Sequence, residues 1–354
     1  MLTANQIKSQ AKSLGFDLCG ISAVDDWSQL SFLDEWLQKG YAGEMHYMSK
    51  TASQRSDVRR VLPSARVVIS LGTVYNTDRP YSIERTDSGE AIISRYAWGD
   101  DYHDIVGART NALLKWMRTV HDDPFDARTY VDTGPVQERV YAQQAGLGWI
   151  GKNTCLINLE IGSWFFLSEI ICSLPLTPDI PALDQCGTCN LCLEACPTDA
   201  IVEPWVLDAT KCISYTTIEL KHEVPESERR RVGANVYGCD ICQDVCPWNA
   251  NAAQTSDDCW QPHSAFDRPR LTQLWRESDD LLGPIVSRSA MSYTGLTRLR
   301  RNVAVALGNS MSHEAALALG ESTLDESKQG SLVNGHVVWA RNRIQQAGDG
   351  NQKR

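Results

Sequence analysis

Eight of the twelve cysteines in this chain fall between residues 186 and 246, in two runs of related spacing. The first run is Cys186-x2-Cys189-x2-Cys192-x3-Cys196-Pro197, and the second is Cys239-x2-Cys242-x3-Cys246-Pro247. Two-cluster iron–sulfur proteins of bacteria use the first spacing, and there the fourth cysteine of a run binds the other [4Fe–4S] cluster. The two-residue spacers let a tight turn present three thiolates to one cluster. These residues therefore predict single-electron chemistry.

The second run lacks one cysteine at its start, and Cys212 supplies the missing thiolate. If the last cysteine of each run crosses over, the eight ligands divide into two sets of four. The first set is Cys186, Cys189, Cys192 and Cys246, and the second is Cys196, Cys212, Cys239 and Cys242. Structural zinc is the alternative, because paired C-x2-C motifs also bind that metal. Two C-x2-C-x3-C-P endings favour clusters.

Composition places these ligands in an ordinary globular chain. The protein has 354 residues, 42% of them hydrophobic, and a net charge of −10, which disfavours a surface covered with nucleic acid. The N-terminus lacks the apolar stretch of a secretory signal, and no run approaches the ~20 apolar residues of a membrane span. We therefore expect a cytoplasmic protein without a membrane partner, in which clustered cysteines are ligands rather than disulfides.

Three regions follow from the sequence pattern. Residues 1–178 combine short β-branched runs, such as 65–72 and 154–158, with a helical pattern over 104–120, and predict an α/β domain. Residues 179–255 follow a proline-rich linker and predict a ferredoxin-like domain organised around two clusters. Residues 256–354 predict helices at 297–308, 313–319 and 335–344, arranged as a HEAT-like domain or a small bundle, with a frayed tail over 345–354.

Two further motifs are weaker. Gly146-Leu-Gly148-Trp-Ile-Gly151 matches the dinucleotide fingerprint, but the segment before it is helix-like and the segment after it strand-like, the reverse of what that motif requires. We therefore expect a turn. Asp101-x-His103 is similar to a motif through which histidine ligates cobalamin, but the following glycine is one residue too far away. We favour a polar residue at a helix start for His103.

Asp132 is the candidate acid outside the cysteine region. It follows the β-like segment 128–131 and precedes a Gly-Pro turn, and the end of a strand is where open α/β sheets place ligands. The alternative is a helix N-cap for the segment starting near Pro135. The residues alone leave catalysis and capping equally supported.

Several motifs, taken in order, resemble the epoxyqueuosine reductase family from about residue 5 to about residue 310. They are VDTGPVQER, GLGWIGKNT, CGTCNLCLEACPTDAI, CISYTTIE and GCDICQDVCPWN. The resemblance implies a cobalamin- and iron–sulfur-dependent enzyme that reduces the epoxide of epoxyqueuosine, at the wobble position of a tRNA, to queuosine. It also implies that Asp132 donates a proton to the substrate above the cobalt, with a pKa raised by the low-dielectric corrin.

The resemblance further assigns the corrin contacts to Arg55, Arg95, Lys152, Asn153 and Tyr215, together with Asp132. The chain has Val58 after Asp57 where the family pattern has proline, so the loop at Arg55 departs from that pattern. Arg298, Arg300 and Arg301 are assigned to tRNA phosphates, because a local basic run can bind a polyanion on an acidic protein. A solvated helix face is the alternative for this run.

The family reading implies a monomer that receives electrons from a cellular donor. Two other functions remain open on the sequence. One is a reductive dehalogenase-like enzyme acting on a small molecule. The other is a ferredoxin-type electron carrier, although a carrier does not need the α/β domain that precedes the cysteines.

Overall fold

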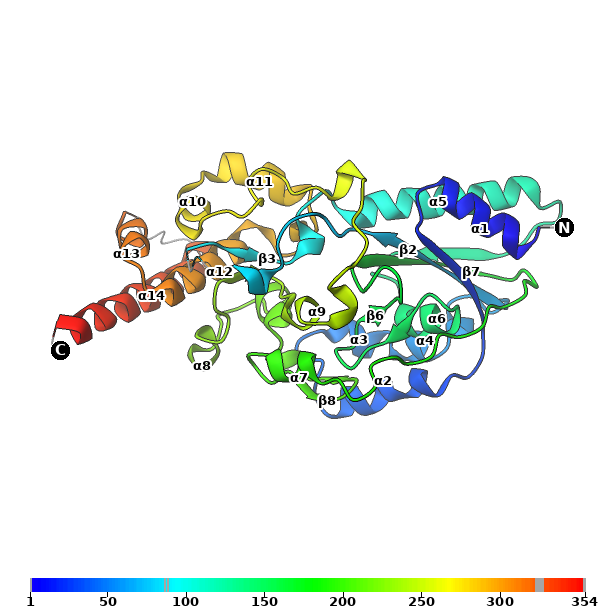
Figure 1. Ribbon diagram of the computed structural model, residues 1–354, viewed down its shortest axis with the longest axis horizontal. Coiled ribbons are helices and arrows are strands. Elements are labelled where there is room, and N and C mark those ends of the chain that lie inside the picture. The colour runs from blue at the N-terminus through cyan, green and yellow to red at the C-terminus, as the bar shows by residue number, and fades with distance from the viewer. Residues whose placement is uncertain (1, 86, 88, 322–327, 353–354) are drawn as a thin grey trace.

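The computed structural model describes residues 2–85, 87, 89–321 and 328–352 (Figure 1). Its central sheet has four strands in the order β1-β2-β7-β4, and every neighbouring pair is antiparallel. The strands are β1 (Leu18–Ala23), β2 (Val67–Val74), β7 (Phe165–Cys172) and β4 (Ala127–Tyr130). Helices cover the sheet as expected for an α/β domain. Because the strands are antiparallel, the rule that places ligands at the carboxyl ends of parallel strands does not apply here.

The two faces of the sheet are buried by different helices. On β2, Ile69 and Leu71 point into the core formed with α1 (Ala4–Ser13) and α5 (Tyr102–Val120). Val68, the residue before Ile69, packs with Val140 of α6 (Glu138–Gln144) on the opposite face. The period-2 alternation of a strand explains this division. Helices on both faces explain why every residue of β2 is buried.

The glycine motif lies between α6 and the hairpin strands β5 (Trp149–Ile150) and β6 (Leu156–Ile157). A helix precedes it and strands follow it, so the expected order is confirmed. Gly146 has a φ of 78°, and a Cβ at Gly148 would lie 2.2 Å from the carbonyl oxygen of Ile157. The glycines therefore serve a tight turn and a close backbone approach.

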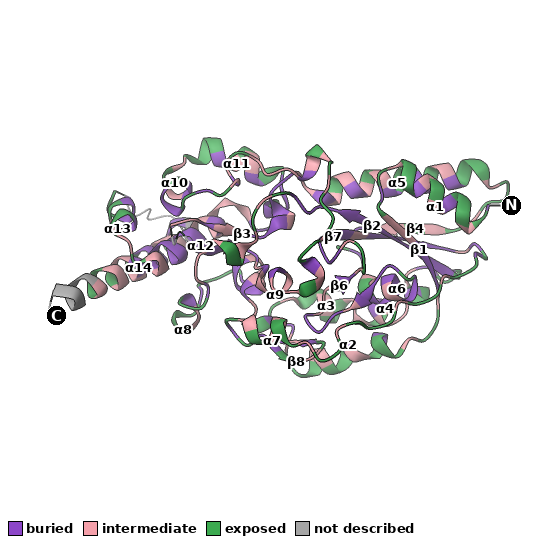
Figure 2. Ribbon diagram, in the orientation of Figure 1, coloured by how far each residue is buried: buried purple, intermediate pink, exposed green. Residues whose placement is uncertain are grey.

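The cysteine-rich segment is built from short elements. They are α7 (Leu191–Ala195), β8 (Ile201–Glu203), β9 (Val206–Leu207), a π-helical turn (Tyr215–Glu219), α8 (Glu226–Arg229), β10 (Asn235–Tyr237) and α9 (Ile241–Asp244). The helices α7 and α9, one from each cysteine run, pack against each other. Figure 2 shows α7 among the exposed parts of the molecule. β10 pairs in parallel with β3 (Ile92–Ile93), which joins this segment to the N-terminal part of the chain.

Helices α2 (Ser28–Gln38), α3 (His46–Lys50) and α4 (Ala52–Ser56) lie on the α6 side of the sheet (Figure 1). The C-terminal helices are α10 (Leu271–Arg276), α11 (Asp279–Ser287), α12 (Gly295–Ser310), α13 (His313–Gly320) and α14 (Lys328–Gln352). All three predicted C-terminal helices are present. The segment predicted to fray is helical through Gln352, and residues 353–354 lie outside the described part. No helix within the described residues is long and apolar enough to cross a membrane.

One apolar core joins the N-terminal and C-terminal regions. It includes Ile7 of α1 and Leu113 of α5, and it continues through Leu299 of α12 to Ala340 of α14. The helical region therefore shares its core with the sheet.

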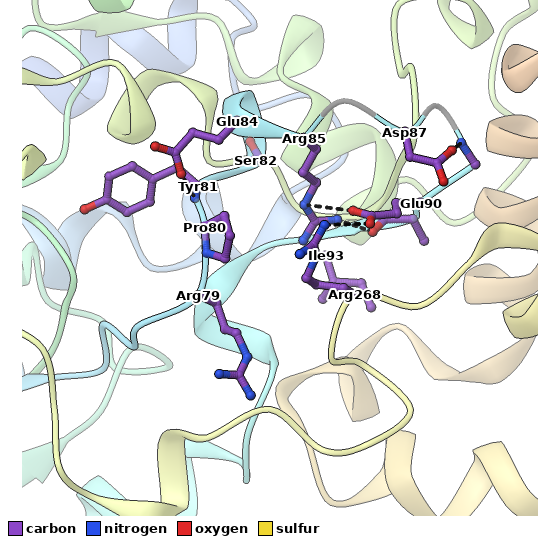
Figure 3. A network of polar contacts seen from close by, with 12 residues as sticks. Arg79, Pro80, Tyr81, Ser82, Glu84, Arg85, Asp87, Glu90, Ile93 and Arg268 are labelled. Carbon is purple, nitrogen blue, oxygen red and sulfur yellow. Dashed lines mark hydrogen bonds and ion pairs between the residues drawn. The ribbon is translucent and has the colours of Figure 1, made fainter.

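A polar network fastens the segment that precedes β3 to the C-terminal region. Glu90 accepts a hydrogen bond from Arg268 at 2.8 Å and faces Arg85 at 4.0 Å, as the dashed lines in Figure 3 show. Arg85 and Glu90 have side chains that are 6% and 13% exposed. Burying a charged pair without further partners destabilises a protein. Arg268 and the backbone carbonyls around the pair therefore help to stabilise it.

Candidate functional site

Asp132 lies on the loop after β4, at the edge of the sheet. Its φ is 54°, in the left-handed region that residues other than glycine rarely adopt. Its carboxylate does not cap α6, because the N-cap of that helix is Gln137 and makes no side-chain capping bond. The capping alternative for Asp132 is therefore wrong. The side chain is 56% exposed, and it is held by contacts on its protein side.

Two residues at the start of α5 make those contacts. The Tyr102 hydroxyl donates a hydrogen bond to Oδ2 of Asp132 at 2.8 Å, and Nε2 of His103 lies 3.4 Å from the same oxygen. The other ring nitrogen of His103, Nδ1, lies 2.7 Å from Oδ1 of Asp101, the N-cap residue of α5. His103 is thus more than the polar residue at a helix start that we expected, since its ring stands between two carboxylates.

The charges at this site set where its proton resides. Burial lowers the pKa of His103, but hydrogen bonds and charge from Asp101 and Asp132 outweigh it and raise the pKa to about 9. Desolvation acts to raise the pKa of Asp132, but hydrogen bonds from His103 and Tyr102 and the nearby Arg139 hold it below its ordinary value. At neutral pH the proton is on the imidazole. The chain by itself therefore gives the opposite of the raised Asp132 pKa that we expected beside a corrin.

Two carboxyls behind Asp132, the half-buried Glu138 and the buried Glu169, were missed from the sequence. Burial and the charge of Asp132 raise the pKa of Glu138, at the start of α6, to about 7. Burial and the charges of Glu138 and Asp132 also raise the pKa of Glu169, on β7, well above its ordinary value. Glu169 is 2% exposed, and its Oε2 has no hydrogen-bond partner. The only signal in the sequence was a lone acid within the apolar run of β7.

The first cysteine set surrounds a single cavity. A cavity of about 210 Å³ is lined by all four members of the set, Cys186, Cys189, Cys192 and Cys246. Lys152, Asn153 and Trp248 are among its other lining residues. The charge of the Cys246 thiol interacts with those of Cys186 and Cys192. Cys246 comes from the second run, so the crossover predicted from spacing brings residues of both runs to one cavity.

The second cysteine set gathers in the same way. Cys239 interacts electrostatically with Cys212 and Cys196, and Cys242 interacts with Cys239 and Cys212. The detached Cys212 thus lies with the run that lacks a cysteine. The Cys155 thiol adjoins Cys242 and is within electrostatic range of Cys246, so it lies between the two sets. Sequence spacing gave no signal for this position of Cys155.

A single zinc ion and a [4Fe–4S] cluster need thiolates at different spacings. Four thiolates around one tetrahedral zinc, at about 2.3 Å each from the metal, lie roughly 3.8 Å from one another. Among the described residues, no three His, Cys, Asp or Glu side chains converge closely enough to hold a single ion. A [4Fe–4S] cluster places its metals between the thiolates and needs the wider spacing that a cavity provides.

Comparison with known proteins identifies the cysteine region and the chain as a whole. A family model described as "4Fe-4S double cluster binding domain" matches residues 185–249, and one described as "Epoxyqueuosine reductase QueG, DUF1730" matches residues 55–133. Epoxyqueuosine reductase of Xanthomonas campestris is 39% identical over 341 residues, covering 95% of each chain. The chain belongs to the epoxyqueuosine reductase family. It is therefore an oxidoreductase whose residues 185–249 form a double iron–sulfur cluster domain.

Solved structures of epoxyqueuosine reductases have the same fold. One, in complex with an epoxyqueuosine-modified tRNA-Tyr stem loop, is 29% identical with a TM-score of 0.84, and the match covers 96% of this chain and 89% of that one. Another, from Bacillus subtilis, is 29% identical with a TM-score of 0.83, with 96% and 90% covered. In that structure a catalytic loop bearing an aspartate is swung out of the active site.

The five side chains assigned to the corrin besides Asp132 are bonded within the chain. The Arg55 guanidinium donates to Thr51 Oγ1 at 3.0 Å and to the carbonyl of Val136 at 3.1 Å. The Tyr215 hydroxyl accepts the backbone N–H of Glu44 at 2.9 Å. Both residues are under 10% exposed. Arg55 thus holds the segment before α6, and Tyr215 holds the backbone at Glu44.

Arg95 is held even more completely. It is 3% exposed, and its guanidinium donates to the carbonyls of Thr77, Arg79 and Pro80. Its own backbone N–H donates to Oδ2 of Asp240, which stands between Cys239 and Cys242 in the sequence, at 2.7 Å. Arg95 therefore connects the segment shown in Figure 3 to the second cysteine set.

Lys152 and Asn153 contact the cysteine loops directly. The Lys152 ammonium donates to the carbonyls of Gly187 and Cys189, each at 2.8 Å, and to Oδ1 of Asn190 at 3.0 Å. The Asn153 amide donates to the carbonyl of Cys242 at 3.1 Å. One residue thus fastens the first cysteine run and its neighbour fastens the second.

The three arginines assigned to tRNA phosphates are bonded to the chain's own carbonyls. Arg301 is 0% exposed and donates to the carbonyls of Thr216, Leu220 and His222. A side chain in that position does not reach a phosphate, so the assignment of Arg301 to tRNA is wrong. The guanidinium of Arg298 donates to the carbonyl of Ile218 at 2.7 Å, and that of Arg300 to the carbonyl of Trp275 at 3.0 Å. The basic run of α12 holds the π-helical turn and α10 in place.

Proposed function

We propose that this chain reduces the epoxide of epoxyqueuosine in a tRNA anticodon to the alkene of queuosine. Family membership over 95% of the chain supports the reaction, and a relative that binds an epoxyqueuosine-modified stem loop supports the substrate. The observation that carries the proposal within this chain is the exposed Asp132 carboxylate, held by Tyr102 and His103 on a strained loop. That arrangement can deliver a proton, and the adjoining cluster domain can deliver electrons.

The reaction itself defines what the protein must supply. Both C–O bonds of the epoxide break, the oxygen leaves as water and a C=C bond forms, which consumes two electrons and two protons. Iron–sulfur clusters carry one electron at a time. Two clusters, recharged by a donor, satisfy the electron requirement. Protons must come from side chains at the substrate.

We propose cobalamin as the group between clusters and substrate. When bound, it supplies a cobalt centre that takes up electrons and passes them to the substrate carbon. Five residues fit cobalamin as supports of the loops around it, because their polar side-chain atoms form hydrogen bonds within the chain. They are Arg55, Arg95, Lys152, Asn153 and Tyr215. Asp132 fits as a direct neighbour, since its carboxylate is exposed.

We assign to Asp132 the transfer of a proton to the departing epoxide oxygen. Its carboxylate is the exposed member of a group of ionisable residues that also includes Tyr102, His103 and Glu138. Residues with left-handed backbone persist where the surroundings hold them, and here two hydrogen-bonding residues do so. The movement of an aspartate-bearing catalytic loop in the Bacillus subtilis relative is consistent with a loop of this kind.

The two cysteine sets give the clusters different surroundings. Cys186, Cys189, Cys192 and Cys246 form the proposed first site, beside the exposed α7 (Figure 2). Cys196, Cys212, Cys239 and Cys242 form the second, beside the buried Asp240 and Arg95. We propose that electrons enter at the first site and leave from the second.

The electron donor is then a protein that reaches the first site. Residues 178–205 contain five acidic side chains and no lysine or arginine: Asp179, Asp184, Glu194, Asp199 and Glu203. Leu183, Leu191 and Trp205 of this segment are exposed apolar residues. A redox protein with basic residues around its own centre complements such a surface.

We propose that exposed aromatic residues, rather than the arginines of α12, contact the tRNA. The hydroxyls of Tyr47 and Tyr293 both donate to Glu219, at 3.1 and 2.9 Å, and the rings are 42% and 50% exposed. Tyr47 is within electrostatic range of Asp132. Aromatic side chains of this kind suit the unstacked bases of a single-stranded loop.

The proposal is tested by measuring metals and turnover on the same sample. After anaerobic purification and incubation with cobalamin, we expect about eight irons and one cobalt per chain. That sample should convert epoxyqueuosine in a modified stem loop to queuosine. Eight irons without retained cobalt would favour an electron carrier. Both metals without tRNA turnover would favour a small-molecule reductase, and zinc in place of iron would contradict the redox function.

A further inference from the structure

Asp101, His103 and Asp132 form a continuous polar chain that the proposed function does not yet use in full. Asp101 accepts the backbone N–H of His103 at 3.0 Å, and its Oδ1 lies 2.7 Å from the ring nitrogen Nδ1. An ionised carboxylate only accepts hydrogen bonds, so Nδ1 carries a proton. Nε2 is buried and lies 3.4 Å from Oδ2 of Asp132. The ring is thus oriented by one carboxylate toward the other.

The charge on this ring is not explained by the start of a helix. A cation at a helix N-terminus is opposed by the helix dipole, which favours anions there. Two carboxylates nevertheless flank the imidazole, and together they raise its pKa to about 9. The fold therefore holds a protonated histidine at a position where the helix alone disfavours it.

The groups that face this chain come from several elements, and Glu169 of β7, Tyr96 and Tyr237 of β10 lie within electrostatic range of its carboxylates. Tyr102 of α5 stacks on the His103 ring, with centroids 4.0 Å apart, and bonds Asp132. The Ser292 hydroxyl donates to Asp101 from the turn after α11. Glu138 and Arg139 of α6 act on Asp132 with opposite charges, and Tyr47 of α3 lies within electrostatic range of it. Arg139 is the only one of these that carries a permanent positive charge.

We infer that His103 is the proton store for Asp132, oriented by Asp101. This inference rests on the proposed role of Asp132. The Nε2–H bond of His103 breaks as an O–H bond forms on Asp132, and that O–H bond then breaks as the proton passes to the epoxide oxygen. One proton moves and no electron does, and the neutral imidazole regains its proton from solvent. An ionised Asp132 thereby acts as an acid at neutral pH.

His103 and Asp101 are positioning and proton-supplying residues in this scheme, because Asp132 alone meets the substrate. Removing Nε2 by His103→Gln should slow single turnover by about 100-fold, the lower range for loss of general acid catalysis. Asp101→Asn keeps the imidazole ring of His103 but removes a carboxylate that stabilises its positive charge. It should slow turnover less and move the alkaline limb of the pH–rate profile to lower pH.

The direct test reads the histidine itself. The chain has seven histidines. When these are labelled with ¹³C and the clusters are kept oxidised, each histidine gives its own NMR signal. The signal that is missing in His103→Gln belongs to His103. We expect the His103 signal to titrate near pH 9, and nearer 6.5 in Asp101→Asn. His121→Gln, at the other end of α5, is the matched control and should leave the signal and turnover unchanged.

The outcomes separate this inference from the proposed function. Loss of turnover in Asp132→Asn with normal turnover in His103→Gln would overturn the proton store and keep Asp132 as donor. Normal turnover in Asp132→Asn would overturn both. A His103 signal that titrates near 6.5 in the unaltered chain would overturn the store whatever the rates are.

Discussion

The Tyr102 hydroxyl and the Asp132 carboxylate are joined by a hydrogen bond of 2.8 Å between the first turn of α5 and the loop after β4. This bond stabilises the ionised carboxylate and holds a residue whose φ is 54°. It therefore links the geometry of the proposed active site to its charge.

Tyr102→Phe removes that bond and keeps the ring that stacks on Phe166. We expect the pKa of Asp132 to rise and single turnover to fall by about 10-fold, because a hydrogen bond to a charged group contributes roughly 1.5–3 kcal/mol. The pH–rate profile of the variant, measured with saturating reductant, checks this. An unchanged profile would show that the hydroxyl does not act on Asp132.

Lys152→Gln should weaken the first cysteine loop. The ammonium bonds two carbonyls and one side chain of that loop, so its loss removes three hydrogen bonds that hold the loop. We expect iron content to fall from about eight toward about four per chain. Lys211→Gln is the control, because Lys211 adjoins Cys212 but its side chain is 47% exposed. Equal iron loss in both variants would argue against a specific role of Lys152.

Arg301→Ala should destabilise the protein rather than weaken its affinity for tRNA. The substitution leaves the carbonyls of Thr216, Leu220 and His222 buried without a donor. We expect the apparent Tm to fall by about 5 °C or more. The exposed Arg231→Ala should change it by roughly 1 °C. A normal Tm together with much weaker stem-loop binding would instead support a contact between Arg301 and a tRNA phosphate.

Acid should destabilise the C-terminal helices through His336. This residue is 0% exposed, and its Nε2 accepts the backbone N–H of Val224 at 3.1 Å. Burial lowers its pKa from 6.5 to about 4. Between these values the unfolded chain binds the proton and the folded chain does not, so stability falls as pH decreases from about 6.5 to about 4.

The expected loss is about 3 kcal/mol at the acid limit, from 1.36 kcal/mol per pKa unit. Thermal unfolding from pH 7 to pH 4.5 measures it, and His336→Gln should flatten the pH dependence. A dependence of the same slope in that variant would assign the acid sensitivity to other groups.

The sequence predicted most where neighbours along the chain determine the structure. The two predicted cysteine sets follow from short spacers and from the exchange of the last cysteine of each run, and in the structure the members of each set lie near one another. The helices 297–308 and 313–319 followed from apolar spacing in the same way. The strands β2, β4 and β6 were also predicted, as the runs 65–72, 128–131 and 154–158, whereas β1 and β7 were not. The antiparallel order depends on long-range pairing that local patterns do not encode.

Long-range contacts explain what the sequence did not reveal. The segment Asp101-x-His103 resembles a cobalamin-binding motif whose glycine is one residue too far away. The contact between His103 and Asp132 forms only in the folded chain, so the local sequence does not reveal it. Arg301 had the charge of a phosphate ligand, but charge does not report burial, and the carbonyls that it satisfies come from the π-helical turn. Glu138 was visible in the sequence, but its burial behind Asp132 was not.

The central claim is that Asp132 delivers a proton during epoxide reduction, and Asp132→Asn tests it most directly. The change removes the acid and preserves size, so iron and cobalamin content should equal those of the unaltered chain. Single turnover on an epoxyqueuosine-modified stem loop should then fall by at least about 100-fold. Turnover within about twofold of the unaltered chain, at equal metal content, would contradict the account.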